Sequence, residues 1–312
     1  MRGPIIADDF KGQFSGHETF PLRHLWLRKA FDAVEGGAPR SVFTGPEAIV
    51  TFGVGKNMAL AIRHWALACG IIEEDDAAVA NPTALGLALF GGDKPWDSYL
   101  EHPATTWLVQ WLVAGNPRMT TTWYWAFNHL SAQTFDHEAL SKSILEYSRF
   151  RKWSRIAEKT VMRDVECFIR SYVPRNDKSA GEDSLEPVMA ELGLIRPLGG
   201  RVYEFRRGPK PSLPDGVFAF ALNDFWQRHA PSAATLSVEA IAYEPGSPGR
   251  VFKLDENSVV ERLTALEEMT RGKIVWSDSA GVRQVLKLKP VNNPLSLLAS
   301  AYRVDHAKRR AA

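Results

Sequence analysis

One loop near the amino terminus combines residue types that can act on a phosphate ester. Segment 14–23 reads Phe-Ser-Gly-His-Glu-Thr-Phe-Pro-Leu-Arg, and Thr19 can cap a helix that starts within it. His17 could remove a proton, Glu18 could bind a metal ion, and Arg23 near a helix amino terminus favours phosphate. The alternative is structural, with His17 and Glu18 holding the loop by hydrogen bonds. The sequence therefore offers His17, Glu18 and Arg23 as candidate catalytic residues.

A second group of polar residues lies on the predicted helix 56–69. A short helical pattern at 46–52 and a glycine break precede it, which is the outline of a helix-turn-helix. Apolar residues at spacings of four, three and four form its buried stripe, namely Met58, Ile62, Trp65 and Cys69. Asparagine can pair with adenine and arginine with guanine, and both also bind phosphates. The candidate DNA-binding residues on the outward face are Lys56, Asn57, Arg63 and His64. A solvated helix face without a partner is the alternative.

A clearer pair of helical patterns spans 139–147 and 156–168. Its second helix carries the apolar stripe Val161, Val165, Phe168 and Tyr172. Segment 194–207 then reads as two strands about a glycine turn. A helix pair followed by a hairpin is the outline of a winged helix, and an arginine-rich hairpin could follow a phosphate backbone. The candidate DNA-binding residues here are Lys159, Thr160, Arg163, Arg201, Arg206 and Arg207.

The last third of the chain repeats this outline. Helical patterns at 217–229, 238–243 and 258–269 precede a hairpin at 273–288. Ser237 and Asp255 are the expected caps of the second and third of these helices. The apolar stretch 103–114 and the aromatic run 120–127 are expected to form core.

Composition narrows the class of protein. A chain of 312 residues that is 45% hydrophobic suits two or three domains. The formal net charge of +2 does not itself indicate a nucleic-acid partner, so the distribution of basic residues must be considered. No stretch approaches the roughly 18 uncharged apolar residues of a membrane span, and the amino terminus is unlike a signal peptide. Cys69 and Cys167 are expected to be buried thiols in a reducing cytoplasm.

One motif is similar to a nucleotide-binding loop but lacks two of its required features. Gly53-Val54-Gly55-Lys56 lacks the interval between glycine and Gly-Lys that a phosphate-binding loop requires. Asn57 also stands where serine or threonine would hold magnesium. The sequence therefore does not predict an ATP site there.

These patterns predict a mainly α-helical α+β fold with small β-hairpins, built from tandem modules of the winged helix-turn-helix type. The expected domains are an amino-terminal helical helix-turn-helix domain at 1–130, a winged-helix-like module at 131–212, and a second one at 213–312. Segment 174–186, rich in charge, serine and glycine, is the expected mobile loop.

Several blocks spread over nearly the whole chain resemble one known family. They are the loop 14–23, Gly53 to Met58, Ala104 to Trp107, Thr121 to Trp125, Arg206 to Pro209, Tyr243 to Gly249 and Phe252 to Ser258. In these blocks the chain resembles the SspB-type family of bacterial proteins. That family is encoded beside sulfur-transfer genes in DNA-phosphorothioation and phage-defence clusters.

Membership would imply a DNA nickase, which opens one strand of double-stranded DNA so that partners can replace a non-bridging phosphate oxygen with sulfur. The implied partners are a cysteine desulfurase, an ATP-pyrophosphatase-type sulfur carrier and an ATPase. Mg²⁺ or Mn²⁺ is a candidate cofactor because nicking is phosphodiester hydrolysis, although the sequence shows no compact cluster of Asp and Glu. The alternatives are a non-catalytic DNA-binding adaptor that recruits the sulfur-transfer enzymes, and a transcriptional regulator.

Overall fold

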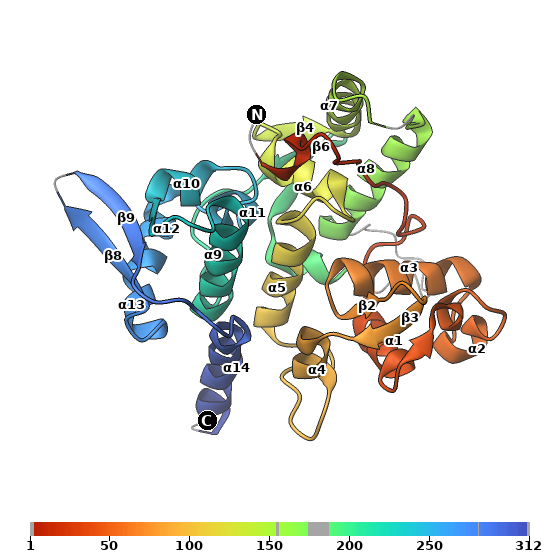
Figure 1. Ribbon diagram of the computed structural model, residues 1–312. Coiled ribbons are helices and arrows are strands. Elements are labelled where there is room, and N and C mark those ends of the chain that lie inside the picture. The colour runs from red at the N-terminus through yellow and green to blue at the C-terminus, as the bar shows by residue number, and fades with distance from the viewer. Residues whose placement is uncertain (1–2, 154–155, 174–186, 280, 311–312) are drawn as a thin grey trace.

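The chain is rich in α-helix and carries three small antiparallel sheets of three strands each (Figure 1). The computed structural model describes residues 3–153, 156–173, 187–279 and 281–310, with backbone alone for 304–310. The predicted loop 174–186 lies outside the described residues. None of the described helices is long and apolar enough to cross a bilayer. The expected α+β class with small hairpins is confirmed.

The same order of elements occurs three times along the chain. The first unit (26–82) contains α1 (Trp26–Val34), β1 (Ala38–Pro39), α2 (Ala48–Phe52), α3 (Lys56–Ala68), β2 (Ile72–Glu74) and β3 (Val79–Pro82). The second unit (121–205) contains α6 (Thr121–Asn128), β4 (Thr134–Asp136), α7 (His137–Phe150), α8 (Glu158–Tyr172), β5 (Ile195–Gly199) and β6 (Val202–Phe205). The third unit (215–287) contains α9 (Asp215–His229), β7 (Thr235–Ser237), α10 (Val238–Tyr243), α12 (Glu256–Thr264), β8 (Ile274–Ser279) and β9 (Val282–Lys287).

Sheet topology repeats as well. In each unit the last strand lies in the middle of the sheet and pairs antiparallel with both others, in the orders β1-β3-β2, β4-β6-β5 and β7-β9-β8. The remaining helices are α4 (Ala84–Phe90), α5 (Pro103–Ala114), α11 (Pro248–Val251), α13 (Leu266–Met269) and α14 (Leu295–Arg310). Short 3₁₀ turns complete the chain, among them Val188–Leu192 before β5.

Local capping signals explain several helix starts. Ser237 accepts a hydrogen bond from the Ala240 amide and Asp255 from the Ser258 amide, so both predicted caps are confirmed. The predicted helix start at Thr19 is wrong, because Thr19 has φ 68° and α1 begins only after Leu25 at φ 65°. Such left-handed residues interrupt a helix, so segment 14–23 remains a loop. The predicted helix 258–269 is also divided, into α12 and α13.

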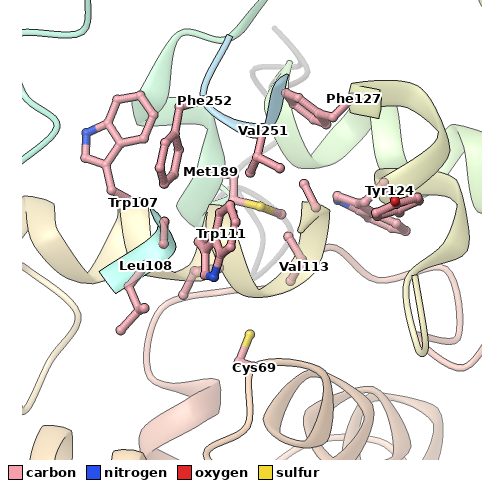
Figure 2. Packing of buried hydrophobic residues seen from close by; sticks show 14 of the residues in the cluster. Cys69, Trp107, Leu108, Trp111, Val113, Tyr124, Phe127, Met189, Val251 and Phe252 are labelled. Carbon is pink, nitrogen blue, oxygen red and sulfur yellow. The ribbon is translucent and has the colours of Figure 1, made fainter. Parts of the chain in front are cut away.

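Helix α5 is the centre of the molecule. Ten of its twelve residues are buried, as expected for a helix that is apolar on all sides. Figure 1 shows it between the other units, and in Figure 2 its Trp107 and Trp111 lie beside Phe252 of the third unit. The ring centroids are 5.7 and 5.8 Å from that of Phe252. The expectation that 103–114 and 120–127 form core is confirmed.

A buried polar side chain on α5 fixes two units against each other. The Gln110 side-chain oxygen accepts a hydrogen bond from the Tyr172 hydroxyl of α8 at 2.5 Å. Its side-chain nitrogen donates to the Val251 carbonyl of the third unit at 2.9 Å. Because an unpaired buried amide is costly, these bonds favour one arrangement of α5, α8 and α11.

Loop 14–23 is held between the first and second units. His17 Nε2 lies 2.6 Å from Asp164 Oδ1 of α8, and the Ser15 amide donates to the same oxygen at 2.7 Å. The His17 ring also stacks on Trp65 of α3, with centroids 6.0 Å apart. A Cβ at Gly16 would lie 2.4 Å from the His64 ring, so only glycine fits there. The loop therefore connects α3 to α8 through buried polar and aromatic contacts.

One buried histidine, His64, and one partly buried histidine, His129, are held in neutral form. Burial, together with the nearby His17, lowers the pKa of His64 to about 3. Burial likewise lowers the pKa of His129 to about 4, with Arg250 contributing. Neither Nε2 has a hydrogen-bond partner among the described residues. The folded protein therefore resists protonation at both sites, whereas the unfolded chain accepts a proton near pH 6.5.

Replacing Asp164 should destabilise the fold strongly. We expect Asp164→Ala to lower the free energy of unfolding by about 3 kcal/mol or more, because the Ser15 amide and His17 would lose a buried charged acceptor. Asp164→Asn should cost less, since an amide oxygen can still accept both bonds. Chemical denaturation measures the effect, with Glu158→Ala, exposed on the same helix, as the control. A loss for Asp164→Ala no larger than that of the control would contradict the role given to this pair.

Stability should also fall in mild acid. Both histidines have pKa values lowered on folding, so stability is full above about pH 6.5 and declines as pH falls toward about 4. The expected slope is on the order of 1 kcal/mol per pH unit for each histidine. Thermal unfolding against pH measures it, and His129→Phe should flatten the decline while the exposed His229→Phe should not. An unchanged slope in His129→Phe would refute this account.

Candidate nucleic-acid interface

Helix α8 presents a basic amino-terminal half to solvent. Val161, Val165 and Phe168 are fully buried, which confirms the predicted stripe. Lys159 and Arg163 lie on the opposite side and are exposed, while Thr160 and Arg170 are partly buried. The outward residues expected from periodicity therefore share one accessible helix face.

A groove lies between another side of α8 and the β5–β6 hairpin. Its volume is about 770 Å³. Met162, Glu166 and Arg170 of α8 form one wall, and Gly200, Arg201 and Tyr203 of the hairpin form another. The floor includes Asp136, His137 and Glu138, and His137 Nε2 lies 2.8 Å from the Met162 carbonyl. The helix and the hairpin thus border one concave surface, with Arg201 at its rim.

The equivalent hairpin of the first unit has the opposite charge. Glu73 and Glu74 end its first strand and Asp75 and Asp76 follow, whereas the second unit has Arg201 in its turn and Arg206 directly after the hairpin, with Arg196 paired to Glu204. Arg63 of α3 donates from Nε and Nη2 to the two oxygens of Glu74, both at 2.5 Å. An arginine held in a two-point ion pair is not available to a phosphate. The first unit therefore offers less positive charge at the corresponding place.

Helix α3 differs from the sequence prediction at one residue. Lys56 and Asn57 are exposed as expected, at the start of the helix. His64 was expected on the outward face and is instead 4% exposed. The reason is the loop 14–23, which covers that side of α3 and places Gly16 against the His64 ring. The periodicity of the helix cannot predict this burial, because it results from contact with a loop that is distant in the sequence.

The three candidate catalytic residues have different surroundings. His17 is 2% exposed, and both ring nitrogens are engaged, Nε2 by Asp164 and Nδ1 by the Thr19 amide at 3.1 Å. Arg23 is 7% exposed, with its guanidinium 5.4 Å from the Trp26 ring centroid. Glu18 is partly exposed. This geometry matches the structural alternative for His17, while the catalytic assignment stays a prediction.

A metal site does not emerge from the described side chains. Within the part of the chain that the structure describes, no three His, Cys, Asp or Glu residues lie close enough together to hold a metal ion. The residues present there therefore do not form a ready site for the expected Mg²⁺ or Mn²⁺. No step of a reaction is assigned to a metal.

Sequence reasoning overlooked several residues that the structure makes important. Asp164 was passed over although it lies three residues after Val161, where a carboxylate on the apolar side of a helix is unusual and signals a buried partner. Lys210, Arg250 and Lys253 were also missed. Lys210 and Lys253 lie outside the helices and strands, and Arg250 lies in the four-residue helix α11, so no period indicates which residues come together in space.

Comparison with known proteins places the chain in a family. The model of the family described as a protein of unknown function (DUF4007) matches residues 14–302. Two crystal structures of SspB, one of them magnesium ion-bound, align with a TM-score of 0.81 and 28% sequence identity, covering 96% of this chain and 89% of theirs. A search of curated protein sequences gives no match. The chain therefore belongs to the DUF4007 family, and the SspB-type resemblance expected from its sequence is confirmed.

Proposed function

We propose that the protein binds double-stranded DNA as a component of a bacterial DNA-phosphorothioation and defence system in the cytoplasm. The observation that carries DNA binding is the second unit, where Lys159 and Arg163 are exposed on α8, and Arg170 and Arg201 line the groove between α8 and the hairpin. The similarity to SspB supports the choice of system. The proposed partners, besides DNA, are the cysteine desulfurase, sulfur carrier and ATPase of that system.

The three units are proposed to be winged-helix modules. Support comes from the thrice-repeated order of helix, strand, two helices and two strands, and from the central place of the last strand in each sheet. Because α6 opens the second repeat, we place the boundary between the first two modules before residue 121 rather than at 130. We keep the proposed boundary between the second and third modules at 212–213, shortly before α9 begins at Asp215.

The second module is the proposed main DNA contact. In winged helices the second helix of the pair enters the major groove and phosphate contacts fix its position. Lys159 and Arg163 on α8 and Arg201 on the hairpin are placed to do this. Lys56 and Asn57 of α3 are proposed as auxiliary contacts, because the acidic hairpin of the first module repels phosphate and occupies Arg63.

Strand nicking and adaptor function make different demands on this interface. Nicking requires an activated nucleophile and stabilisation of a charged transition state. The resemblance to the SspB-type family favours nicking. The engagement of both nitrogens of His17 favours an adaptor that recruits the sulfur-transfer enzymes, unless partners or DNA rearrange the loop. Glu18 is a partly exposed candidate catalytic residue, so its replacement can distinguish strand nicking from DNA binding.

Removing the basic face of α8 should weaken DNA binding. We expect Lys159→Gln/Arg163→Gln to lower affinity for duplex DNA at least tenfold at moderate salt, and to reduce the slope of log K against log salt by about 1 for each lost phosphate contact. Fluorescence anisotropy measures both. Lys56→Gln should have a smaller effect, and Lys94→Gln, an exposed lysine outside the three units, should have none. Equal losses in all variants would argue against a specific role for the second module.

Plasmid conversion distinguishes the nickase from the adaptor. Supercoiled plasmid incubated with the protein and Mg²⁺ or Mn²⁺ should give open circles if the chain nicks DNA. Glu18→Gln should then abolish conversion while leaving duplex binding intact, because Glu18 lies outside the proposed DNA-contacting face. Intact plasmid in the presence of normal binding, with the sulfur-transfer partners added, would establish the adaptor instead.

A further inference from the structure

A small cavity lies where the third unit meets the last helix. The turn 270–273 joins α13 to β8, and the cavity separates this turn from the first turns of α14 (Figure 1). Its volume is about 220 Å³. The polar residues that line it are Thr270, Arg271, Lys273, Ser296, Ser300 and Arg303, and the other lining residues are apolar. Because the lining includes three cations and no acidic residue, the cavity is suited to an anion.

The three cations of this cavity are not neutralised by ion pairs. Among the residues that the structure describes, no carboxylate lies within ion-pairing distance of Arg271, Lys273 or Arg303, and none of the three side chains makes a hydrogen bond. The acidic residues that precede the turn, Glu267 and Glu268, do not line the cavity, and Glu268 lines a different one. The positive charges at the cavity are therefore available to a ligand.

Arg271 occupies a backbone position that does not favour arginine. Its φ is 53°, and Gly272 follows at φ 71°. The Arg271 amide donates to the Glu268 carbonyl at 3.1 Å and the Gly272 amide to the Glu267 carbonyl at 2.8 Å, which closes the end of α13. Glycine adopts such left-handed backbone freely, whereas a long side chain makes it unfavourable. An arginine held in this conformation points to a role for its side chain.

Helix α14 supplies the opposite wall of the cavity. Ser296, Ser300 and Arg303 follow one another at spacings of four and three residues, which places them on one side of the helix. The hydroxyls of Ser296 and Ser300 donate to the Asn293 and Leu297 carbonyls, both at 2.6 Å. Because a hydroxyl has one hydrogen to donate, the three cations must supply the donors for a ligand.

We propose that Arg271, Lys273 and Arg303 bind the phosphate group of a small molecule, either inorganic phosphate or a small phosphate monoester. Guanidinium groups bind phosphate oxygens at two points, and an ammonium group adds a compact charge. The cavity is several times larger than the roughly 30 Å³ that one water occupies and smaller than the roughly 300 Å³ at which pockets for drug-sized ligands begin. It therefore admits a phosphate group but not a DNA duplex. None of its cations belongs to the second unit, so the site does not depend on the proposed DNA interface.

Thermal unfolding of the full chain tests the site. The probes are inorganic phosphate and glycerol phosphate, each compared with sodium chloride at equal ionic strength. Binding raises the melting temperature with the logarithm of ligand concentration, so the curve flattens, whereas exclusion of phosphate from the protein surface raises it in proportion. We expect a flattening rise for the wild type and for Lys94→Gln, an exposed lysine outside the cavity. Arg271→Gln/Lys273→Gln should need about tenfold more ligand for the same rise.

A glycine variant separates binding from folding. Arg271→Gly removes the charge and suits the left-handed backbone, so its melting temperature in chloride should equal or exceed that of the wild type. Its response to phosphate should nevertheless fall. Arg271→Lys keeps a positive charge at this position and should retain part of the response.

A flattening rise that both Arg271→Gly and the double variant lose supports the site. Glycerol phosphate acting at lower concentrations than inorganic phosphate would identify an ester as the ligand, and any other order would identify the free ion. A wild-type curve that does not flatten, or one that the variants reproduce, would overturn the proposal.

Duplex binding by the same variants distinguishes this site from the DNA interface. The double variant should bind duplex DNA as the wild type does. A loss as large as that of Lys159→Gln/Arg163→Gln would make the cavity part of the DNA interface and overturn the assignment to a small molecule. A wild type that does not bind duplex DNA would contradict the proposed function and leave the phosphate response standing.

Discussion

Burial of α5 on nearly all sides is the constraint on which the arrangement of the molecule depends. A helix that is largely apolar all round must be covered by several elements, and here α6, α9, α11 and the 3₁₀ turn Val188–Leu192 pack against it. Gln110 lies in its middle, and the two hydrogen bonds of its buried side chain reach the second and third units. The hydrophobic surface thus holds the units together, and the amide selects one way of packing them.

Fixed packing lets small units with modest individual sheets act as one surface. Three-stranded sheets of this size bury little on their own and need helices against them. With the units held on α5, the β5–β6 hairpin lies beside α8 across one groove, and segment 206–210 follows the hairpin directly. The loop around His17 adds a second tie, from α3 to α8. The charge of the hairpin differs between these two units, because the first hairpin carries acidic residues and the second carries arginines.

Much of the fold could be predicted from the sequence because periodicity and caps are local. The buried stripe of α8, the hairpins about glycine turns, and the caps at Ser237 and Asp255 all follow from residues within a few positions of one another. The start of α1 could not be predicted in this way, since it depends on left-handed residues in a loop pinned by Asp164, well over a hundred positions away.

In the candidate site, too, some residues follow from local sequence signals and others depend on contacts between distant segments. Helical periodicity is enough to predict that residues such as Lys159 and Arg163 lie on the outward face of their helix. Three features depend instead on contacts between separate segments. They are the burial of His64, the pairing of Arg63 with Glu74, and the hydrogen bond from Arg250 to the Tyr243 carbonyl. The basic residues of the sequence thus indicate a nucleic-acid partner in general. The structure adds which of them are engaged in ion pairs, such as Arg63, and which are exposed, such as Lys159 and Arg163.

Hydrogen exchange of the full chain with and without duplex DNA tests most directly the claim that the second unit makes the main DNA contact. The account predicts slowed exchange in α8 and the β5–β6 hairpin, extending into 206–210, with smaller changes in α3 and the hairpin of the first unit. Protection centred on α3 and its hairpin, or no change in α8 under saturating DNA, would contradict it.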